Sequence, residues 1–144
     1  YQRAKLPLVD KSFFDALWKR GSQNVRLLGL YDSETLVGAV VLLIHKKTVY
    51  GLYGGSKAAY YPRRPNDFLF WQVFLWAKQN GFHTYDWMGA GEPNKPYGVR
   101  DWKKQFGGEM VCYGRYQLVH SPLKMKIAET GFRLLQRLKP KKKN

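Results

Sequence analysis

The second half of the chain carries an acidic residue, two glycines and an aromatic–lysine pair in close succession. Asp86 lies at the exit of a predicted strand, Phe82–Trp87, and Gly89 and Gly91 follow it. The segment Trp102-Lys103-Lys104-Gln105-Phe106-Gly107-Gly108 comes next. Transfer of an acyl group to an amine passes through a tetrahedral oxyanion, so the site needs a fixed cation or donor where that charge develops. It also needs a route for the proton that the amine loses. Lys103 could supply the cation, and Asp86 could orient the amine or accept its proton.

Each of these side chains also has an ordinary structural interpretation, which the sequence leaves open. Asp86 could cap the backbone of the following loop in an Asx turn. Trp102 could belong to the core instead of forming a wall of the site. Lys103 and Lys104 could together form a solvated helix face.

Other reactive side chains point to no second chemistry. The histidines His45, His83 and His120 lie at strand edges or ends without ligand spacing, so we expect no metal. Cys112 falls inside a predicted strand, where a packed core thiol is expected. Gly89-Ala90-Gly91 is only half of a dinucleotide fingerprint, because no third glycine opens a helix after it.

Hydrophobic periodicity and turn residues predict the elements that position these residues. Helices are expected over Ser12–Arg20, Asn66–Asn80, Gly98–Gln105 and Pro122–Leu138, and strands over Val25–Tyr31, Leu36–His45, Thr48–Tyr53, Phe82–Trp87 and Glu109–Val119. Asn66 is expected to cap the second helix, whose many aromatic residues predict burial on most sides. Three meandering strands followed by a strand–helix–strand unit predict an α/β (α+β) fold with helices on both faces of a mixed sheet.

Length and composition indicate one basic globular domain. The chain has 144 residues, of which 44% are hydrophobic, and 25 Lys and Arg against 10 Asp and Glu give a net charge of +15. This excludes a disordered basic tail and favours an anionic partner. The longest uncharged apolar run, Leu36–Ile44, is far short of the roughly 20 residues of a membrane span. A single cysteine favours a reducing compartment, so we expect a cytoplasmic protein.

The positive charge is concentrated near the C-terminus. Residues 124–143 contain eight basic residues and one acidic residue, Glu129. We expect a single domain over residues 1–138 and a basic tail over residues 139–144. The predicted last helix is amphipathic and basic, so it could lie on an anionic membrane at the inner face of the cell or along a phosphate backbone. Alternatively, it caps the domain and leaves its basic face solvated.

The segment from Asp86 to Gly108 resembles the FemAB family, aminoacyltransferases that build peptidoglycan bridges and belong to the GNAT-like acyltransferases. Upstream, Tyr53-Gly54-Gly55-Ser56, Tyr60-Tyr61 and the aromatic helix also resemble this family, so the resemblance covers roughly Phe13–Val119. It implies a GNAT-like, mostly antiparallel sheet. It further implies an aminoacyl-tRNA donor, a nucleotide- or lipid-linked peptidoglycan precursor as acceptor, and no cofactor.

The resemblance also implies roles for individual residues. Lys103 and Trp102 would lie at the donor end of the acyl channel. Together with Asp86, whose position at a strand end suggests its role, they are the expected catalytic residues. The residues expected to contact substrate are Tyr53, Tyr61, Arg63, Arg64, Gly89, Gly91, Tyr97 and Phe106. Enzymes of this family usually carry two such domains, so we expect the first domain of a longer chain to be missing here.

The chain departs from a coenzyme-A-binding GNAT at the start of its aromatic helix. There the glycine-rich pyrophosphate loop is replaced by Pro62-Arg63-Arg64-Pro65-Asn66-Asp67, whose prolines remove amide donors. This argues against acetyl-CoA, although Arg63 and Arg64 could still meet a phosphate through their side chains.

Two other functions remain open. The same fold could be an N-acyltransferase that uses acyl-CoA or an acyl-carrier protein. Alternatively, it could be a non-catalytic basic module that binds RNA or anionic lipid, because loop aromatics such as Tyr60 and Tyr97 could stack on bases.

Overall fold

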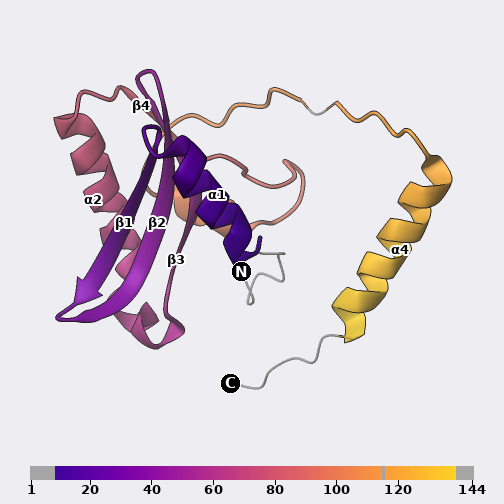
Figure 1. Ribbon diagram of the computed structural model, residues 1–144, viewed down its shortest axis with the longest axis horizontal. Helices are drawn as coiled ribbons and strands as arrows, with labels where there is room; N and C mark the ends of the chain where they lie inside the picture. Colours follow the sequence, from indigo (N-terminus) through magenta and orange to yellow (C-terminus); the bar gives the residue numbers. More distant parts are fainter. Residues whose placement is uncertain (1–8, 115, 139–144) are drawn as a thin grey trace. The chain divides into compact units, whose positions relative to one another are not determined.

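The computed structural model describes residues 9–114 and 116–138 (Figure 1). Residues 9–108 form one compact unit, and the described residues from Glu109 onward belong to a second unit. The predicted basic tail, residues 139–144, lies outside the described residues. In the part of the chain that is described, no helix has the length and apolarity needed to cross a membrane.

A four-stranded mixed sheet forms the centre of residues 9–108 (Figure 1). Strands β1 (Val25–Asp32), β2 (Thr35–His45) and β3 (Thr48–Ser56) form an antiparallel meander, and β4 (Thr84–Asp86) pairs in parallel with β3. The strand order is β1-β2-β3-β4. The predicted mixed, mostly antiparallel sheet is therefore confirmed.

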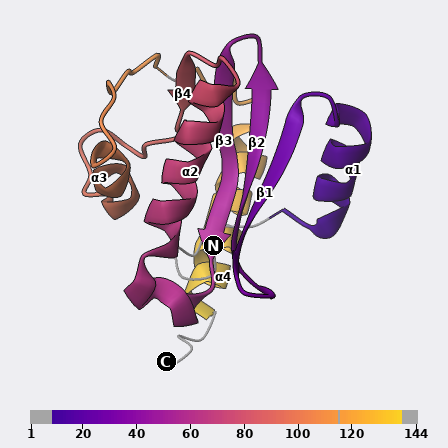
Figure 2. The same cartoon turned by 90° about the vertical axis from the view of Figure 1, so that its left-hand side faces the viewer.

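Helices cover both faces of this sheet (Figure 2). On one face, α2 (Pro65–Gln79) packs its Val73 into a fully buried core with Val40, Leu42 and Val49 of the sheet. On the other face, α1 (Lys11–Gly21) places two phenylalanines against Tyr53 of β3, at ring-centroid distances of 6.1 and 5.2 Å. Side chains alternate between the two faces along a strand, which is why one sheet supports both layers.

The start of α2 differs from the prediction. Arg64, not Asn66, occupies the N-cap position, in a left-handed conformation with φ of 51°, and Pro65 is the first helical residue. Proline suits this position because its fixed φ is helical and the first amide has no partner within the helix. Asn66 therefore lies inside the helix.

The prediction that α2 is buried on most sides is wrong. Leu69, Phe70, Val73 and Ala77 are buried, at helical spacing, on the side that faces the sheet. On the opposite side Phe68 and Trp71 are 54% and 55% exposed. A single sheet covers only one side of the helix, whatever the composition of the other side.

Strands β3 and β4 part soon after they meet. Their parallel pairing runs only from Thr48 with Thr84 to Tyr50 with Asp86, while β3 continues to Ser56. After Asp86 the chain enters a loop and then α3 (Gly98–Lys104). The loop that leads to α3 therefore begins where the two strands part.

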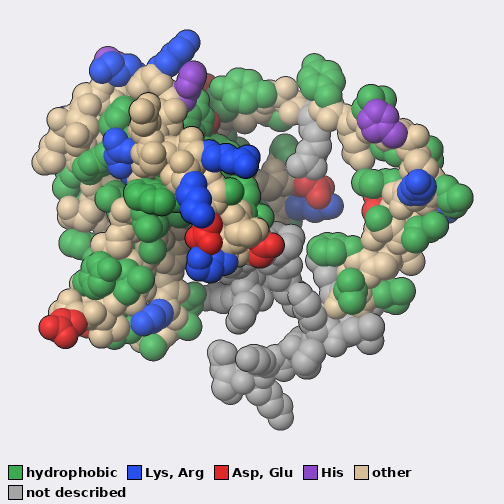
Figure 3. Space-filling model, viewed as in Figure 1, with side chains coloured by type: hydrophobic (Ala, Val, Ile, Leu, Met, Phe, Trp, Pro, Cys, Tyr) green, Lys and Arg blue, Asp and Glu red, His purple; other side chains and the backbone are tan. Residues whose placement is uncertain are grey.

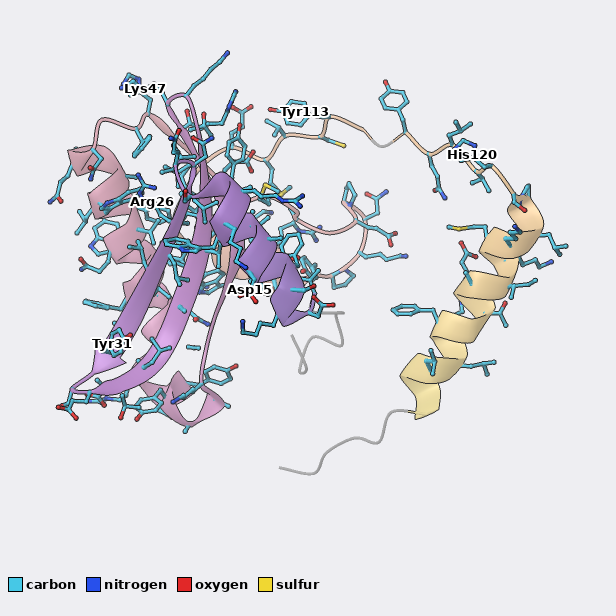
Figure 4. The ribbon with its side chains drawn as sticks, viewed as in Figure 1. Asp15, Arg26, Tyr31, Lys47, Tyr113 and His120 are labelled. Carbon is cyan, nitrogen blue, oxygen red and sulfur yellow. The ribbon has the colours of Figure 1, made fainter. Side chains whose placement is uncertain are left out.

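The predicted strand over Glu109–Val119 does not form in the described residues 109–114 and 116–119, which join no sheet. Cys112 is accordingly exposed and not a core thiol, and the side chains of Tyr113 and His120 project from this extended segment (Figure 4). Alternation of apolar residues makes a strand only where a neighbouring strand takes up its backbone N–H and C=O groups. The following helix, α4 (Pro122–Leu138), has the predicted bounds.

Candidate functional site

The ammonium of Lys103 is held between two backbone carbonyls of the loop that follows β4. Its Nζ donates to the carbonyl oxygens of Trp87 and Gly89, both at 2.7 Å. The same Nζ lies 5.9 Å from the centroid of the Trp87 ring, within the range of a cation–π contact. These contacts connect α3 to the exit of the parallel strand pair.

Lys103 is partly desolvated and keeps a free donor. Burial lowers the pKa of the lysine below its ordinary value of 10.5, and the nearby Asp86 carboxylate opposes part of this shift. An ammonium has three N–H donors. Two of them are used, and the third is engaged by no residue that the structure describes. Lys103 can therefore offer a partly desolvated N–H to a developing oxyanion.

Asp86 forms the turn that the sequence allowed for. Its Oδ1 accepts a hydrogen bond of 2.6 Å from the amide of Met88, a residue held in the left-handed region with φ of 59°. This is the geometry of an Asx turn, in which the carboxylate stabilises a conformation that a non-glycine residue rarely adopts. The second carboxylate oxygen of Asp86 accepts no hydrogen bond from the described residues, so it is free to meet a substrate amine.

An aromatic cluster supports Lys103. Its neighbouring rings have centroids between 4.9 and 5.6 Å apart. The members are Phe70, Phe74, Tyr85, Trp87, Trp102 and Phe106. Trp87 contacts the other five rings and also supplies a carbonyl to Lys103. Trp87 was not among the predicted site residues. Its position directly after Asp86 is the sequence feature that could have identified it.

A hydrogen bond connects Trp102 to the first turn of α2. Its indole N–H donates to Oδ1 of Asp67 at 2.7 Å, and Oδ2 of Asp67 pairs with Nε of Arg64 at 2.6 Å. Asp67 was also missed by the sequence prediction, because an acidic residue in the first turn of a helix is common for reasons of helix stability alone. The half-buried Trp102 ring thus packs against the core. This agrees with the interpretation of Trp102 as a core residue.

Four predicted substrate-binding residues lie in the segment from the end of β4 to just after α3, which carries Lys103. Gly89 supplies a carbonyl to Lys103, and Phe106 belongs to the aromatic cluster. Gly91 adopts a φ of 72° and lies against the Tyr97 ring, since a Cβ at this position would approach Cδ1 of Tyr97 to 2.8 Å. Gly91 and Tyr97 therefore shape the loop between β4 and α3.

The other four predicted substrate-binding residues lie elsewhere in the fold. Tyr53 faces α1 on the opposite side of the sheet, and Tyr61 lies in the short 3-10 helix Ala58–Arg63. Arg63 pairs with Asp32 of the β1–β2 turn at 2.6 Å, and Arg64 pairs with Asp67. A phosphate that bound either arginine would compete with a carboxylate. In the described residues, no group of three or more His, Cys, Asp and Glu side chains could hold a metal ion.

Comparison with known families identifies the fold. A family model described as an acetyltransferase (GNAT) domain matches residues 2–104. This match includes the sheet, α2 and Lys103. The chain belongs to the GNAT acetyltransferase domain family. The predicted GNAT-like acyltransferase is therefore confirmed at the level of the superfamily. No curated protein and no solved structure matched the chain.

The GNAT assignment gives the described geometry a chemical meaning. The parallel strands β3 and β4, which part after Tyr50 and Asp86, and the cation of Lys103 beside β4 belong to an acyltransferase domain. Within this GNAT domain, Lys103 offers an N–H donor and Asp86 a carboxylate oxygen that no described residue engages.

Proposed function

We propose that this GNAT domain is an aminoacyltransferase of the FemAB type, which moves an amino acid from aminoacyl-tRNA to an amine of a peptidoglycan precursor. The observation that carries the proposal is the position of Lys103, whose ammonium lies at the exit of β4, partly desolvated and with one donor free. The Trp102-Lys103 pair and the Phe106-Gly107-Gly108 segment that support it are those that resemble the family.

The proposed reaction assigns one task to each group. The amine nitrogen of the acceptor forms a bond to the ester carbonyl carbon of the aminoacyl-tRNA, and the carbonyl oxygen becomes an oxyanion. Lys103 stabilises that oxyanion through its free N–H. The bond from carbon to the ribose oxygen then breaks, and the proton lost by the amine ends on that oxygen. Asp86 accepts this proton from the amine and returns it to the leaving group.

The start of α2 supports a donor other than coenzyme A. A pyrophosphate binds well to the free amides of a helix N-terminus. Here Pro62 and Pro65 have no N–H, while the amides of Arg64 and Asp67 donate to the carbonyls of Tyr61 and Arg64 at 2.9 and 3.1 Å. The carboxylate of Asp67 adds a negative charge in the same turn. An aminoacyl-tRNA ester needs no such pyrophosphate site.

The test is a transfer assay with three donors: charged tRNA, acyl-CoA and acyl-carrier protein. Nucleotide-linked and lipid-linked precursors serve as acceptors. With charged tRNA, Lys103→Met should lower kcat by about 100-fold or more, in the range found when an oxyanion donor is removed. Lys104→Met, on the exposed side of the same helix, is the matched control and should transfer normally.

The alternative functions give different results in this assay. Transfer from acyl-CoA or acyl-carrier protein, with none from tRNA, would identify an N-acyltransferase of another type. Salt-sensitive RNA binding with no transfer from any donor would indicate a non-catalytic basic module. Normal transfer by Lys103→Met would overturn the role given to the lysine.

A further inference from the structure

Helix α4 is amphipathic, and its apolar side is open to solvent in the described part of the chain. At 100° per residue, Leu123, Ile127 and Leu134 fall on one side of the helix. Leu123 and Ile127 are 71% and 64% exposed. Lys126 and Arg133 fall together about 100° away around the same helix. Figure 3 shows apolar and basic side chains next to one another along α4.

The basic side of α4 carries a single acidic residue, Glu129, and keeps a net positive charge. Among the described residues, no ion pair involves Lys126, Glu129 or Arg133. Residues 122–144 contain eight basic residues and one acidic residue, a net charge of +7. An open apolar strip therefore lies beside a net positive charge.

Charge complementarity decides between the surfaces that could cover this helix. Residues 9–108 contain 14 Lys and Arg and eight Asp and Glu, a net charge of +6. The chain's own GNAT domain, or a second copy of the chain, is thus a surface of like charge. An RNA backbone would match the basic side but would leave Leu123, Ile127 and Leu134 in water. An anionic bilayer interface accepts both sides, since apolar side chains enter the acyl boundary while lysine and arginine meet the headgroups.

We propose that α4 is an interfacial helix that binds the surface of an anionic lipid bilayer. It lies parallel to the membrane with Leu123, Ile127 and Leu134 inserted and Lys126 and Arg133 at the headgroups. The short apolar strip alone gives weak binding, and the electrostatic attraction makes the binding depend on anionic lipid. This inference does not depend on which acyl donor the GNAT domain uses.

The test measures co-sedimentation of the whole chain with two kinds of vesicle, one of pure phosphatidylcholine and one of equal parts phosphatidylcholine and phosphatidylglycerol. We expect binding to the second kind only, weakened by added salt. Lys126→Gln with Arg133→Gln should reduce binding by about fivefold for each charge removed. The matched double variant, Lys19→Gln with Lys78→Gln, removes two exposed helix lysines from the GNAT domain and should reduce binding much less.

A second pair of variants tests the apolar side without changing charge. Leu134→Gln should weaken vesicle binding about tenfold, because it removes a side chain that inserts. Ala128→Gln, which falls about 120° from Leu134 around the same helix, should bind as the unmodified chain does. Equal losses in these two variants, or in the two double-charge variants, would overturn the proposal.

Three further results would also overturn it. The first is equal binding to both kinds of vesicle, and the second is no binding to either. The third is strong hydrogen-exchange protection of residues 122–135 without vesicles, which would show that the chain itself covers α4. If tRNA binds to the chain and Leu134→Gln has no effect on vesicle binding, α4 binds RNA and not lipid.

Discussion

The carboxylate of Asp67 accepts a hydrogen bond of 2.7 Å from the indole nitrogen of Trp102, and this bond joins the first turn of α2 to α3. The two residues are 35 positions apart in the sequence. Trp102 directly precedes Lys103, so the bond holds the helix that carries the candidate catalytic lysine. We therefore expect Asp67 to act through Trp102 as a positioning residue of this lysine.

We expect Asp67→Ala to loosen α3. Loss of a hydrogen bond to a carboxylate should lower the free energy of unfolding by about 1–2 kcal/mol. It should also lower kcat with little effect on KM, because Lys103 loses its position and not its charge. The measurements are denaturant unfolding, steady-state kinetics and the NMR signal of the Trp102 indole N–H, which should shift.

The conservative variant Asp67→Asn separates the two contacts of this carboxylate. It keeps an acceptor for Trp102 and loses the exposed ion pair with Arg64, which should cost less than about 1 kcal/mol. Asp101→Ala, in the first turn of α3, removes an exposed carboxylate as a control and should leave the indole signal unchanged. If Asp67→Asn is as defective as Asp67→Ala, the bond to Trp102 is not what positions α3.

The lowered pKa of Lys103 predicts an early loss of activity at alkaline pH. Only the protonated lysine stabilises an oxyanion, so kcat/KM should begin to fall at a pH below 10.5, the ordinary lysine pKa. The Asp86 carboxylate raises the pKa of Lys103, so Asp86→Asn should move this alkaline fall to still lower pH, besides lowering the rate. The measurement is the pH profile of kcat/KM for both proteins. An unchanged alkaline limb in Asp86→Asn would show that another group titrates.

The same pKa shift has a definite sign for stability. Between the lowered pKa of the folded state and 10.5, the unfolded chain binds more protons at Lys103 than the folded chain does. The free energy of unfolding should therefore rise with pH through this window from the contribution of this lysine. In Lys103→Met that contribution should vanish, which a comparison of unfolding curves at several alkaline pH values can detect.

Gly51 and Tyr85 form a close fit between β3 and β4. A Cβ at Gly51 would overlap the Tyr85 hydroxyl, whose ring is held by Phe74 and Trp87. Gly51→Ala should therefore lower the free energy of unfolding by about 1–3 kcal/mol. Gly55→Ala, on the same strand with open space around it, is the control and should cost much less.

Tyr85→Phe should rescue Gly51→Ala. The Tyr85 hydroxyl is buried without a hydrogen-bond partner among the described residues, and burial raises the pKa of this phenol. Its removal should be neutral or stabilising by itself, since an unsatisfied buried polar group is lost. In the double variant the cost of Gly51→Ala should shrink, as a double-mutant cycle by thermal unfolding can show. Strict additivity would contradict the close fit.

Gly91 and Gly89 offer a comparison within the site loop. Gly91→Ala forces a side chain into the left-handed region and against the Tyr97 ring, so it should cost about 1–2 kcal/mol and displace that ring. A Cβ at Gly89 would meet nothing within 4 Å, and Gly89→Ala keeps the carbonyl that Lys103 uses. The free energy of unfolding of this variant should therefore be nearly unchanged. Unfolding curves and Tyr97 side-chain NMR signals distinguish the two. Equal stabilities would mean that Gly91 is not constrained.

Local elements could be predicted from the sequence because their signals are local. Apolar spacing and turn residues predicted α1, α4 and the β1–β2 hairpin with nearly the observed bounds. The same reasoning failed for Glu109–Val119, where alternation is present but the described residues pair with no strand. The prediction that the outer side of α2 is buried was also wrong, because the composition of a helix does not show how many other elements pack against it.

The sequence by itself determined the residue types of the site and their order along the chain: Asp86 at the end of a strand, a glycine-containing loop, and Trp102-Lys103 on a short helix. Only the tertiary structure decided what holds them. Trp87 at the centre of the aromatic cluster and Asp67 beneath Trp102 depend on contacts between α2, β4 and α3. Periodicity describes which side of an element is apolar, whereas such contacts depend on where β3 and β4 part and on how α2 crosses the sheet.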